Sequence, residues 1–220
     1  MFYSQDNQDK YLEENVFKGY KNGFFVDVGA HDGITINNTL YFEKNNNWKG
    51  INIEPIDKVF NKLIENRPNN ININCAVCNN DGQTEFYFNE GYTEMLSGII
   101  NTFDYRHLDR LQNENTIKGS TTEIINIKTK KLETIFNEHN IKHINYLSID
   151  VEGGEFEVIK SINFNNVFID IIAFESHFDD IGIPIINYLE NNNYIVIRKS
   201  MDIFMIHKNS IFLNNLNFFK

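Results

Sequence analysis

The sequence contains little cysteine: only Cys75 and Cys78 occur among its 220 residues. They form a lone C-x-x-C at the end of an expected strand, and no second Cys or His pair nearby completes a zinc site. A redox disulfide of this spacing normally stands at a helix N-terminus, which the local pattern does not provide. We therefore expect both thiols to be structural.

Positive charge is also scarce, with 20 Lys and Arg against 30 Asp and Glu and a net charge of −10. Because no Lys/Arg cluster compensates this charge, no nucleic-acid partner is expected, and a neutral or polar ligand fits better. No hydrophobic run approaches the roughly 18 residues of a membrane span, and residues 1–10 contain no apolar signal core. We expect a cytoplasmic protein without membrane insertion.

What the chain does contain is an alternation of strand and helix signals typical of an α/β protein with a doubly wound sheet. Hydrophobic residues make up 41% of the chain, which suits one globular domain over 1–220, with an N-terminal leader over 1–22. The pattern does not indicate an oligomeric state. Strands are expected at 24–28, 50–54, 71–77, 83–88, 122–128, 143–150, 168–174, 194–198 and 203–207, the last two as an antiparallel hairpin. Helices are expected near 37–44, 56–66, 131–140, 155–161 and 183–192.

Residues 89–121 show no clean period and contain several glycines, so we predict a long loop with one helical turn over 103–111. Loops of this length in a compact domain are usually functional or mobile. We expect this one to cover a substrate, with Ser97, Tyr105 and His107 as contacts. Surface exposure explains these polar residues nearly as well.

The most informative stretch is FFVDVGAHDG, residues 24–33, where a buried strand meets a turn with Gly29 and Gly33. A strand, a glycine turn and a helix N-terminus together form a nucleotide cradle. The spacing is G-x-x-x-G rather than G-x-G-x-x-G, and Asp27 and Asp32 flank the turn. Two carboxylates repel a pyrophosphate but attract a ligand with an amino group and a sulfonium, such as S-adenosylmethionine. Either aspartate also suits a helix N-cap.

Four expected strands end in acids or in this acid-rich turn: Asp27, Glu54, Asp150 and Glu175. In open α/β sheets the ligand lies beyond the carboxyl ends of the strands, so we expect these acids to surround it. Glu54 follows Gly33 by 21 residues, the position of a ribose-binding acid. A solvated acid at the strand end is the plainer interpretation.

Asp150 and Glu152 are two residues apart, and Gly153-Gly154 lets them converge through a turn instead of diverging as in a strand. We place Asp150 at the reacting centre, with Glu152 and His177 as further candidates for a general base. His177 is alternatively structural or merely exposed. Asp150, Glu152 and Glu175 alternatively bind Mg²⁺ through oxygen ligands.

These pieces resemble an FkbM-type S-adenosylmethionine-dependent methyltransferase. The resemblance rests on VDVGAHDG, INIEP, KLETI, SIDVEGGE and IIAFES in this order, and on a leader with Ser4-Gln5 and Gln8-Asp9 that is similar to one subgroup. It implies a Rossmann-like class I methyltransferase fold: a seven-stranded, mostly parallel sheet with an antiparallel last strand, here with a β-hairpin or loop insertion. Asp32 departs from many relatives, which have a smaller or apolar residue there.

The resemblance also assigns cofactor contacts. It implies that Asp27, Gly29, Ala30, Asp32 and Gly33 hold the amino-acid part of S-adenosylmethionine, that Glu54 binds the ribose and that Ala76 and Val77 border the adenine. His31 and Pro55, which adjoin these residues, are further expected contacts, and Glu175 is expected to bind the substrate. The family-level expectation is O-methylation of a sugar or glycan by in-line transfer.

Three alternatives stay open at this point. The first is a methyltransferase of a protein, lipid or other small molecule, since a fold does not determine the acceptor. The second is a non-catalytic glycan-binding or scaffolding module, whose mark would be loss of the cofactor acids; all are present. The third, an NAD-type oxidoreductase, is disfavoured by the missing G-x-G-x-x-G.

Overall fold

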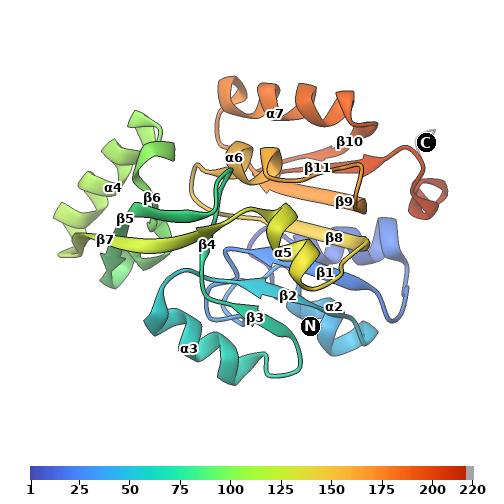
Figure 1. Ribbon diagram of the computed structural model, residues 1–220, viewed down its shortest axis with the longest axis horizontal. Coiled ribbons are helices and arrows are strands. Elements are labelled where there is room, and N and C mark those ends of the chain that lie inside the picture. The colour runs from blue at the N-terminus through green and yellow to red at the C-terminus, as the bar shows by residue number, and fades with distance from the viewer. Residues whose placement is uncertain (217–220) are drawn as a thin grey trace.

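Two β-sheets organise the chain, which the computed structural model describes over residues 1–216 (Figure 1). The larger sheet has seven strands in the order β10-β11-β9-β8-β1-β2-β3. Its strands are β1 (Phe24–Val28), β2 (Lys49–Ile53), β3 (Ile71–Ile73), β8 (His143–Ile149), β9 (Phe168–Glu175), β10 (Tyr194–Lys199) and β11 (Asp202–His207). Only β11 runs antiparallel to its neighbours in this described sheet. The predicted mostly parallel sheet with an antiparallel last strand is confirmed.

Both faces of the large sheet are covered, because its inner strands are apolar on both sides. Val26 and Leu147 face one core, which is completed by α5 (Leu132–Glu138), α6 (Glu155–Lys160) and α7 (Asp179–Asn191). Phe25 and Tyr146 face the other core, which contains Phe42 of α2 (Leu40–Asn46). The remaining crossover helix, α3 (Asp57–Asn66), packs Val59 against the smaller sheet. These five helices lie where the sequence places helices, with ends shifted by a few residues.

The leader belongs to the second of these cores. It forms α1 (Gln8–Tyr11) and a π-helical segment η1 (Leu12–Phe17). Leu12 and Val16 are fully buried, and the Phe17 ring packs edge-on against Trp48 with their centroids 4.8 Å apart. The leader is therefore an integral part of the fold. Its amphipathic spacing covers a sheet face that would otherwise be exposed.

The smaller sheet is an insertion that projects beyond the carboxyl ends of the large sheet's strands, green in Figure 1. It has the order β4-β7-β5-β6, made of β4 (Ala76–Val77), β5 (Gly82–Glu90), β6 (Gly98–Ile99) and β7 (Thr121–Lys130). The long antiparallel pairing of β5 with β7 confirms the predicted hairpin element.

The prediction of a loop over 89–121 is wrong. This segment folds into η2 (Gly91–Leu96), β6, η3 (Ile100–Thr102) and the 14-residue helix α4 (Tyr105–Lys118). Asp104 caps α4 by accepting from the Arg106 N–H, and Gly119 ends it with a φ of +69°. Only His107 and Leu111 of α4 are buried, so the apolar period is too sparse to be recognised in the sequence.

The predicted strand 71–77 is also wrong as a single element. Residues 71–73 pair with β2 in the large sheet, whereas residues 76–77 pair with β7 in the small one. Between them, the Asn74 side chain donates to the backbone carbonyls of Glu54 and Pro55, both at 3.2 Å. This crossing brings Ala76 and Val77 beside Glu54.

Among residues 1–216, no helix has the length and apolar character needed to cross a bilayer.

Candidate active site

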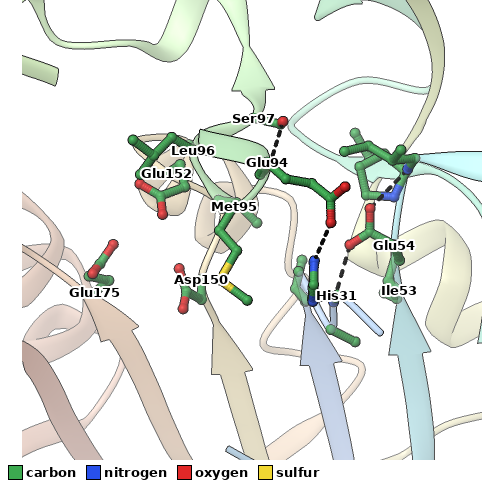
Figure 2. A pocket seen from close by; sticks show the side chains of 18 of the residues that line it. His31, Ile53, Glu54, Glu94, Met95, Leu96, Ser97, Asp150, Glu152 and Glu175 are labelled. Atoms are coloured by element: carbon green, nitrogen blue, oxygen red, sulfur yellow. Dashed lines mark hydrogen bonds and ion pairs between the residues drawn. The ribbon is translucent and has the colours of Figure 1, made fainter. Parts of the chain in front are cut away.

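A cavity of about 430 Å³ lies over the carboxyl ends of β1, β2, β8 and β9, and the insertion forms its opposite wall. Figure 2 shows Glu175, Asp150, His31 and Glu54 side by side along this edge, in the order of the strands that carry or precede them. Glu94, Met95, Leu96 and Ser97 of the insertion face them across the space. The expectation that the strand-end acids share one edge therefore agrees with the geometry for Glu54, Asp150 and Glu175.

Gly29 is required for this edge to close. Its φ is +85°, and a Cβ at this position would lie 1.8 Å from the backbone oxygen of Asp150, closer than any real contact. The N–H groups of Gly29 and Ala30 both donate to the Ile53 carbonyl at 3.0 Å. The turn thus joins the ends of β1, β2 and β8, which positions Asp150 and Glu54 on either side of it.

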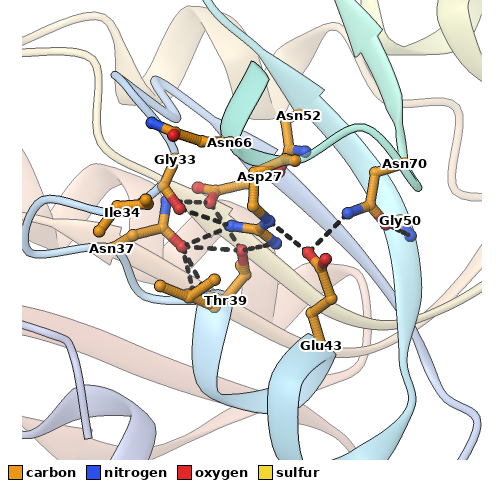
Figure 3. A network of polar contacts seen from close by, with 12 residues as sticks. Asp27, Gly33, Ile34, Asn37, Thr39, Glu43, Gly50, Asn52, Asn66 and Asn70 are labelled. Atoms are coloured by element: carbon orange, nitrogen blue, oxygen red, sulfur yellow. Dashed lines mark hydrogen bonds and ion pairs between the residues drawn. The ribbon is translucent and has the colours of Figure 1, made fainter. Parts of the chain in front are cut away.

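Asp27 points into a buried polar network rather than standing free at the ligand. Figure 3 shows its carboxylate with Asn37 and Thr39, which both donate to Asp27 Oδ2 at 2.8 Å. Arg67, which is fully buried, donates to Asn37 Oδ1, to Thr39 Oγ1 and to the Gly33 carbonyl, and pairs with Glu43. Burial raises the pKa of Asp27, while Arg67 acts in the opposite direction. Asp27 borders the cavity, but its charge is engaged internally.

Asp32 and Gly33 do not line the cavity. Asp32 accepts from the N–H groups of Ile34 and Thr35 at 2.9 and 2.7 Å, which is the local turn role that its position also allowed. Gly33 has a φ of +76°, and a Cβ there would lie 2.6 Å from the Arg67 side chain. The two flanking carboxylates therefore do not form the cation-attracting pair that the sequence suggests.

The predicted helix N-terminus also differs from the expectation. Helix α2 begins at Leu40, and Asn37 Oδ1 accepts from the N–H groups of Thr39 and Leu40 at 3.0 and 2.9 Å. The Asn37 side chain therefore occupies donors at this helix start that a ligand would otherwise use. The cradle consists of the turn and the strand ends instead.

Glu54 occupies the centre of one end of the cavity. Its Oε1 accepts from the Ile56 N–H at 2.9 Å and its Oε2 from the His31 N–H at 3.2 Å, so the backbone holds the carboxylate in one orientation. Burial raises its pKa to about 7, with a further increase from the negative charge of Glu94. Pro55 also lines the cavity, and the surrounding wall is apolar: Ile53, Ile56, Ala76, Val77, Phe86 and Ile99.

His31 connects the glycine turn to the insertion. Its Nε2 lies 3.1 Å from Glu94 Oε1 of η2, and both side chains are about one-fifth exposed. His31 has a left-handed backbone with a φ of +49°. The contact makes Glu94 a wall residue of the Glu54 end, and no pattern in the sequence indicates it.

Asp150, Glu152 and Glu175 converge at the other end of the cavity, with one carboxylate oxygen from each within 4.8 Å of the others. Glu152 has a φ of +59° and Gly153 of +111°, so the chain turns back after β8, as expected from the glycine pair. Burial raises the pKa of Asp150 and Glu152 well above their ordinary values, and the charge of Glu175 raises both further. This cluster holds a proton or attracts a positive charge.

Of the predicted site residues His177, His107 and Tyr105, only His177 lines the cavity. His177 Nε2 lies 3.1 Å from Glu175 Oε1 on the cavity wall, and this hydrogen bond raises the pKa of His177. His107 is buried outside the lining, with its Nε2 3.5 Å from Glu152 Oε2. Tyr105 is 69% exposed and points away from the site, because it begins α4 on its outer side.

The remaining lining residues include one predicted contact and several that the sequence did not indicate. Ser97 is a predicted contact that does line the space, and its hydroxyl donates to the Glu94 carbonyl at 2.7 Å. Unexpected lining residues include Gln5 of the leader, Glu94, Met95, Arg110 and Met201. The leader motif was visible as a pattern, but it does not indicate a cavity wall. Cys75 and Cys78 are buried and unbridged, in agreement with the structural role.

The comparisons with known proteins agree with this geometry. The sequence profile described as "Methyltransferase FkbM domain" matches residues 27–196. The chain belongs to the FkbM methyltransferase family. No curated protein sequence matches it.

A solved FkbM methyltransferase shows the same fold at low sequence identity. The methyltransferase FkbM from Methylobacillus flagellatus KT aligns with a TM-score of 0.52 and 12% identity over 86% of this chain and 44% of that one. This chain thus spans less than half the length of that relative. A human methyltransferase 10 domain containing protein aligns with a TM-score of 0.49 and 11% identity, over 90% of this chain and 79% of its own. Precorrin-6y C5,15-methyltransferase from Geobacter metallireducens GS-15 aligns at 0.46 and 11%, over 94% and 88%.

Proposed function

We propose that the protein is an S-adenosylmethionine-dependent O-methyltransferase that acts on a hydroxyl group of a sugar or glycan. The observation that carries this proposal is the division of the cavity into two ends. One end has Glu54, a carboxylate oriented by two backbone N–H groups, among apolar side chains and with Glu94 on the opposite wall, and the other end has three converging carboxylates. Family membership supports methyl transfer from S-adenosylmethionine in general terms.

The residues of the Glu54 end fit the methyl donor. Glu54 is 5% exposed and lines the cavity, and each of its oxygens accepts one backbone N–H and can accept one more donor, which suits a pair of ribose hydroxyl groups. Ala76 and Val77 offer flat apolar contact for an adenine ring, and the Gly29–His31 turn would border the amino-acid part. S-adenosylmethionine supplies a methyl group activated on a positively charged sulfur, and the acid-rich cavity favours that charge.

The residues of the acid end fit an acceptor hydroxyl that must lose its proton. A sugar hydroxyl is a weak acid, and general-base assistance is worth about 10²- to 10⁴-fold. Asp150 faces the cavity, and a carboxyl with a raised pKa accepts a proton more readily than an ordinary one. The His177–Glu175 pair offers a second route, in which Glu175 orients the imidazole. We assign Asp150 as the base, with Glu152 and His177 as the next candidates.

A divalent cation is the second candidate for the same step. Asp150, Glu152 and Glu175 would hold Mg²⁺ through one oxygen each, since their oxygens already lie within 4.8 Å of one another. The ion would lower the pKa of the acceptor hydroxyl and position it. Under this alternative the three carboxylates serve as ligands and not as bases.

The proposal has three further parts. The acceptor is a small molecule or glycan, and residues 1–220 form a single methyltransferase domain. The segment η2 and its neighbours cover the acceptor. Net charge and the acid end both disfavour nucleic acid. A protein, lipid or other small-molecule acceptor is the nearest alternative. A non-catalytic module would need no converging acids beside the donor end.

The test has a binding arm and a turnover arm. Calorimetry should show binding of S-adenosylmethionine and S-adenosylhomocysteine but not of NADH. With methyl glycosides of common hexoses, N-acetylhexosamines and amino sugars, mass spectrometry should show addition of one methyl group. Binding without turnover of any glycoside would overturn the sugar acceptor, and no binding of either sulfur compound would overturn the methyltransferase assignment.

Two variants separate the roles within the acid cluster. Asp150→Asn should keep the affinity for S-adenosylmethionine and reduce turnover by about 10²-fold or more. Glu157→Gln is the matched control from the same segment, because Glu157 lies on α6 and pairs with Lys160 outside the cavity. If turnover survives exhaustive treatment with EDTA, the base mechanism stands and the cation mechanism is excluded.

A further inference from the structure

The leader folds around a buried carboxylate. Asp9 is fully buried, and its Oδ2 accepts from the Tyr3 N–H at 2.6 Å while its Oδ1 accepts from the Ser4 hydroxyl at 2.6 Å. The Asp9 N–H returns a bond to Ser4 Oγ at 3.2 Å. These reciprocal bonds hold residues 3–5 in one turn. Hydrogen bonds to a charged acceptor are stronger than those between neutral groups, so the turn is well determined.

The residues that follow this turn connect the leader to the strands at the acid end of the cavity. The Gln8 side chain accepts from the Asp6 N–H at 2.7 Å and hydrogen-bonds Asp202, the first residue of β11. Asp202 pairs in register with Glu175 on β9. Arg198 of β10 donates to Asp6 at 3.1 Å. The leader therefore connects directly to the strand end that carries one acid of the cluster.

Within residues 1–22, all of which the structure describes, only Gln5 lines the cavity. It follows Ser4, whose hydroxyl donates to Asp9, and Met201 of the β10–β11 connection lines the same cavity. Among residues 1–216 no hydrogen bond engages its carboxamide, and the residue is exposed. A rigidly held turn with a free amide beside it is the arrangement of a recognition residue.

We propose that Gln5 binds the acceptor at the acid end of the cavity and that the Ser4–Asp9 turn positions it there. This inference rests on the proposed function and adds an acceptor contact from the leader. A carboxamide both donates and accepts hydrogen bonds, as a hydroxyl does, so Gln5 suits a polyol acceptor. Being neutral, it also adds a hydrogen-bonding group to the cavity that contains Asp150, Glu152 and Glu175 without adding to their charge.

The experiment compares steady-state kinetics of wild type and Gln5→Ala on the methyl glycoside that wild type turns over best. Losing one hydrogen bond to a neutral group should raise KM for that glycoside about 3- to 10-fold. The kcat value and the dissociation constant of S-adenosylmethionine should stay within about twofold of wild type. Asn15→Ala is the matched control, because it removes an exposed amide from the same leader outside the cavity.

A double-mutant cycle tests the positioning role of Asp9. If Asp9 acts through Gln5, Asp9→Asn should raise KM for the glycoside, and Asp9→Asn in the Gln5→Ala background should raise it no further. An unchanged KM in Gln5→Ala, or a weaker affinity for S-adenosylmethionine instead, would overturn the inference. Failure of wild type to methylate any glycoside would instead overturn the proposed sugar acceptor, a separate and distinguishable result.

Discussion

Two groups of acids lie at neighbouring strand ends and differ completely in their partners. Asp27, in β1, is surrounded by Asn37, Thr39 and the buried Arg67, which neutralise and orient it. Asp150, which follows β8, meets only the carboxylates of Glu152 and Glu175 and the cavity. The first group stabilises the fold, and the second gathers three carboxyl groups, with only histidines as partners, where a ligand can reach them. Position at a strand end does not decide the role of an acid; its partners do.

The largest expected effect comes from breaking the paired group. Arg67→Met removes the buried cation and leaves Asp27 and Glu43 without it, which should lower the free energy of unfolding by about 3–5 kcal/mol. Urea denaturation measures this change. Arg106→Met is the control, because Arg106 pairs with Asp104 and the exposed Asp180 at the surface, so its loss should lower the free energy of unfolding far less. Equal losses in the two variants would contradict the distinction.

Removing a charge from the second group, at Asp150, Glu152 and Glu175, should change the free energy of unfolding in the opposite direction. Glu152→Gln removes one of three repelling carboxylates, so the free energy of unfolding at pH 8 should rise by about 1–2 kcal/mol, while turnover falls. A carboxyl whose pKa is raised by folding contributes stability at low pH and loses it as pH rises. At pH 4 the variant and wild type should therefore unfold at the same urea concentration. A destabilised variant at pH 8 would show that the contacts of Glu152 with His107 and the charge of Arg110 outweigh the repulsion among the carboxylates, contrary to this expectation.

Glu54 gives a smaller and sharper test by pH. Its pKa is raised from 4.5 to about 7, so the ligand-free protein should lose stability as pH rises from about 4.5 to 7 and little more above that. The loss from this group is at most about 3 kcal/mol. In Glu54→Gln the difference in unfolding free energy between pH 5 and pH 8 should shrink, while the affinity for S-adenosylmethionine falls. An unchanged difference would show that other groups account for the pH dependence.

The smallest effect is expected at the contact between the insertion and the glycine turn. Glu94→Gln keeps a hydrogen bond to His31 but removes a negative charge that raises the pKa of Glu54. The pH at which stability is lost should move down by less than about one unit, and unfolding free energy should change by less than about 1 kcal/mol. Denaturation curves over pH 5–8 measure both. A shift to higher pH would have the wrong sign for this interaction.

The large sheet was predictable because its inner strands are continuous apolar runs that end in turns. Two examples are Phe24–Val28 and Phe168–Glu175, which are almost entirely buried. A short apolar run of this kind between turns is typical of a buried strand, so the pattern alone identified both. Helix α4 was missed because only His107 and Leu111 are buried, which leaves its sequence polar. The break between β3 and β4 was missed because apolar alternation runs through Asn74 without a turn signal.

For the candidate site, the sequence pointed to the edge and to most of the acids on it. It could not assign Asp27, because the decisive partner, Arg67, is 40 residues away and reaches Asp27 only through packing of α3 against the turn. Glu94 and Gln5 were missed for the same reason, since each enters the cavity from an element whose position depends on long-range pairing.

The amino-acid sequence by itself determined the strands, the glycine turn and the carboxylates that follow them, because these depend on local periodicity and on backbone conformations that glycine allows. Only the tertiary structure decided which carboxylates are neutralised, which remain unpaired and which elements close the cavity. Those outcomes depend on electrostatic and packing contacts between residues far apart in the chain, and such contacts exist only once the sheet, the insertion and the leader have come together.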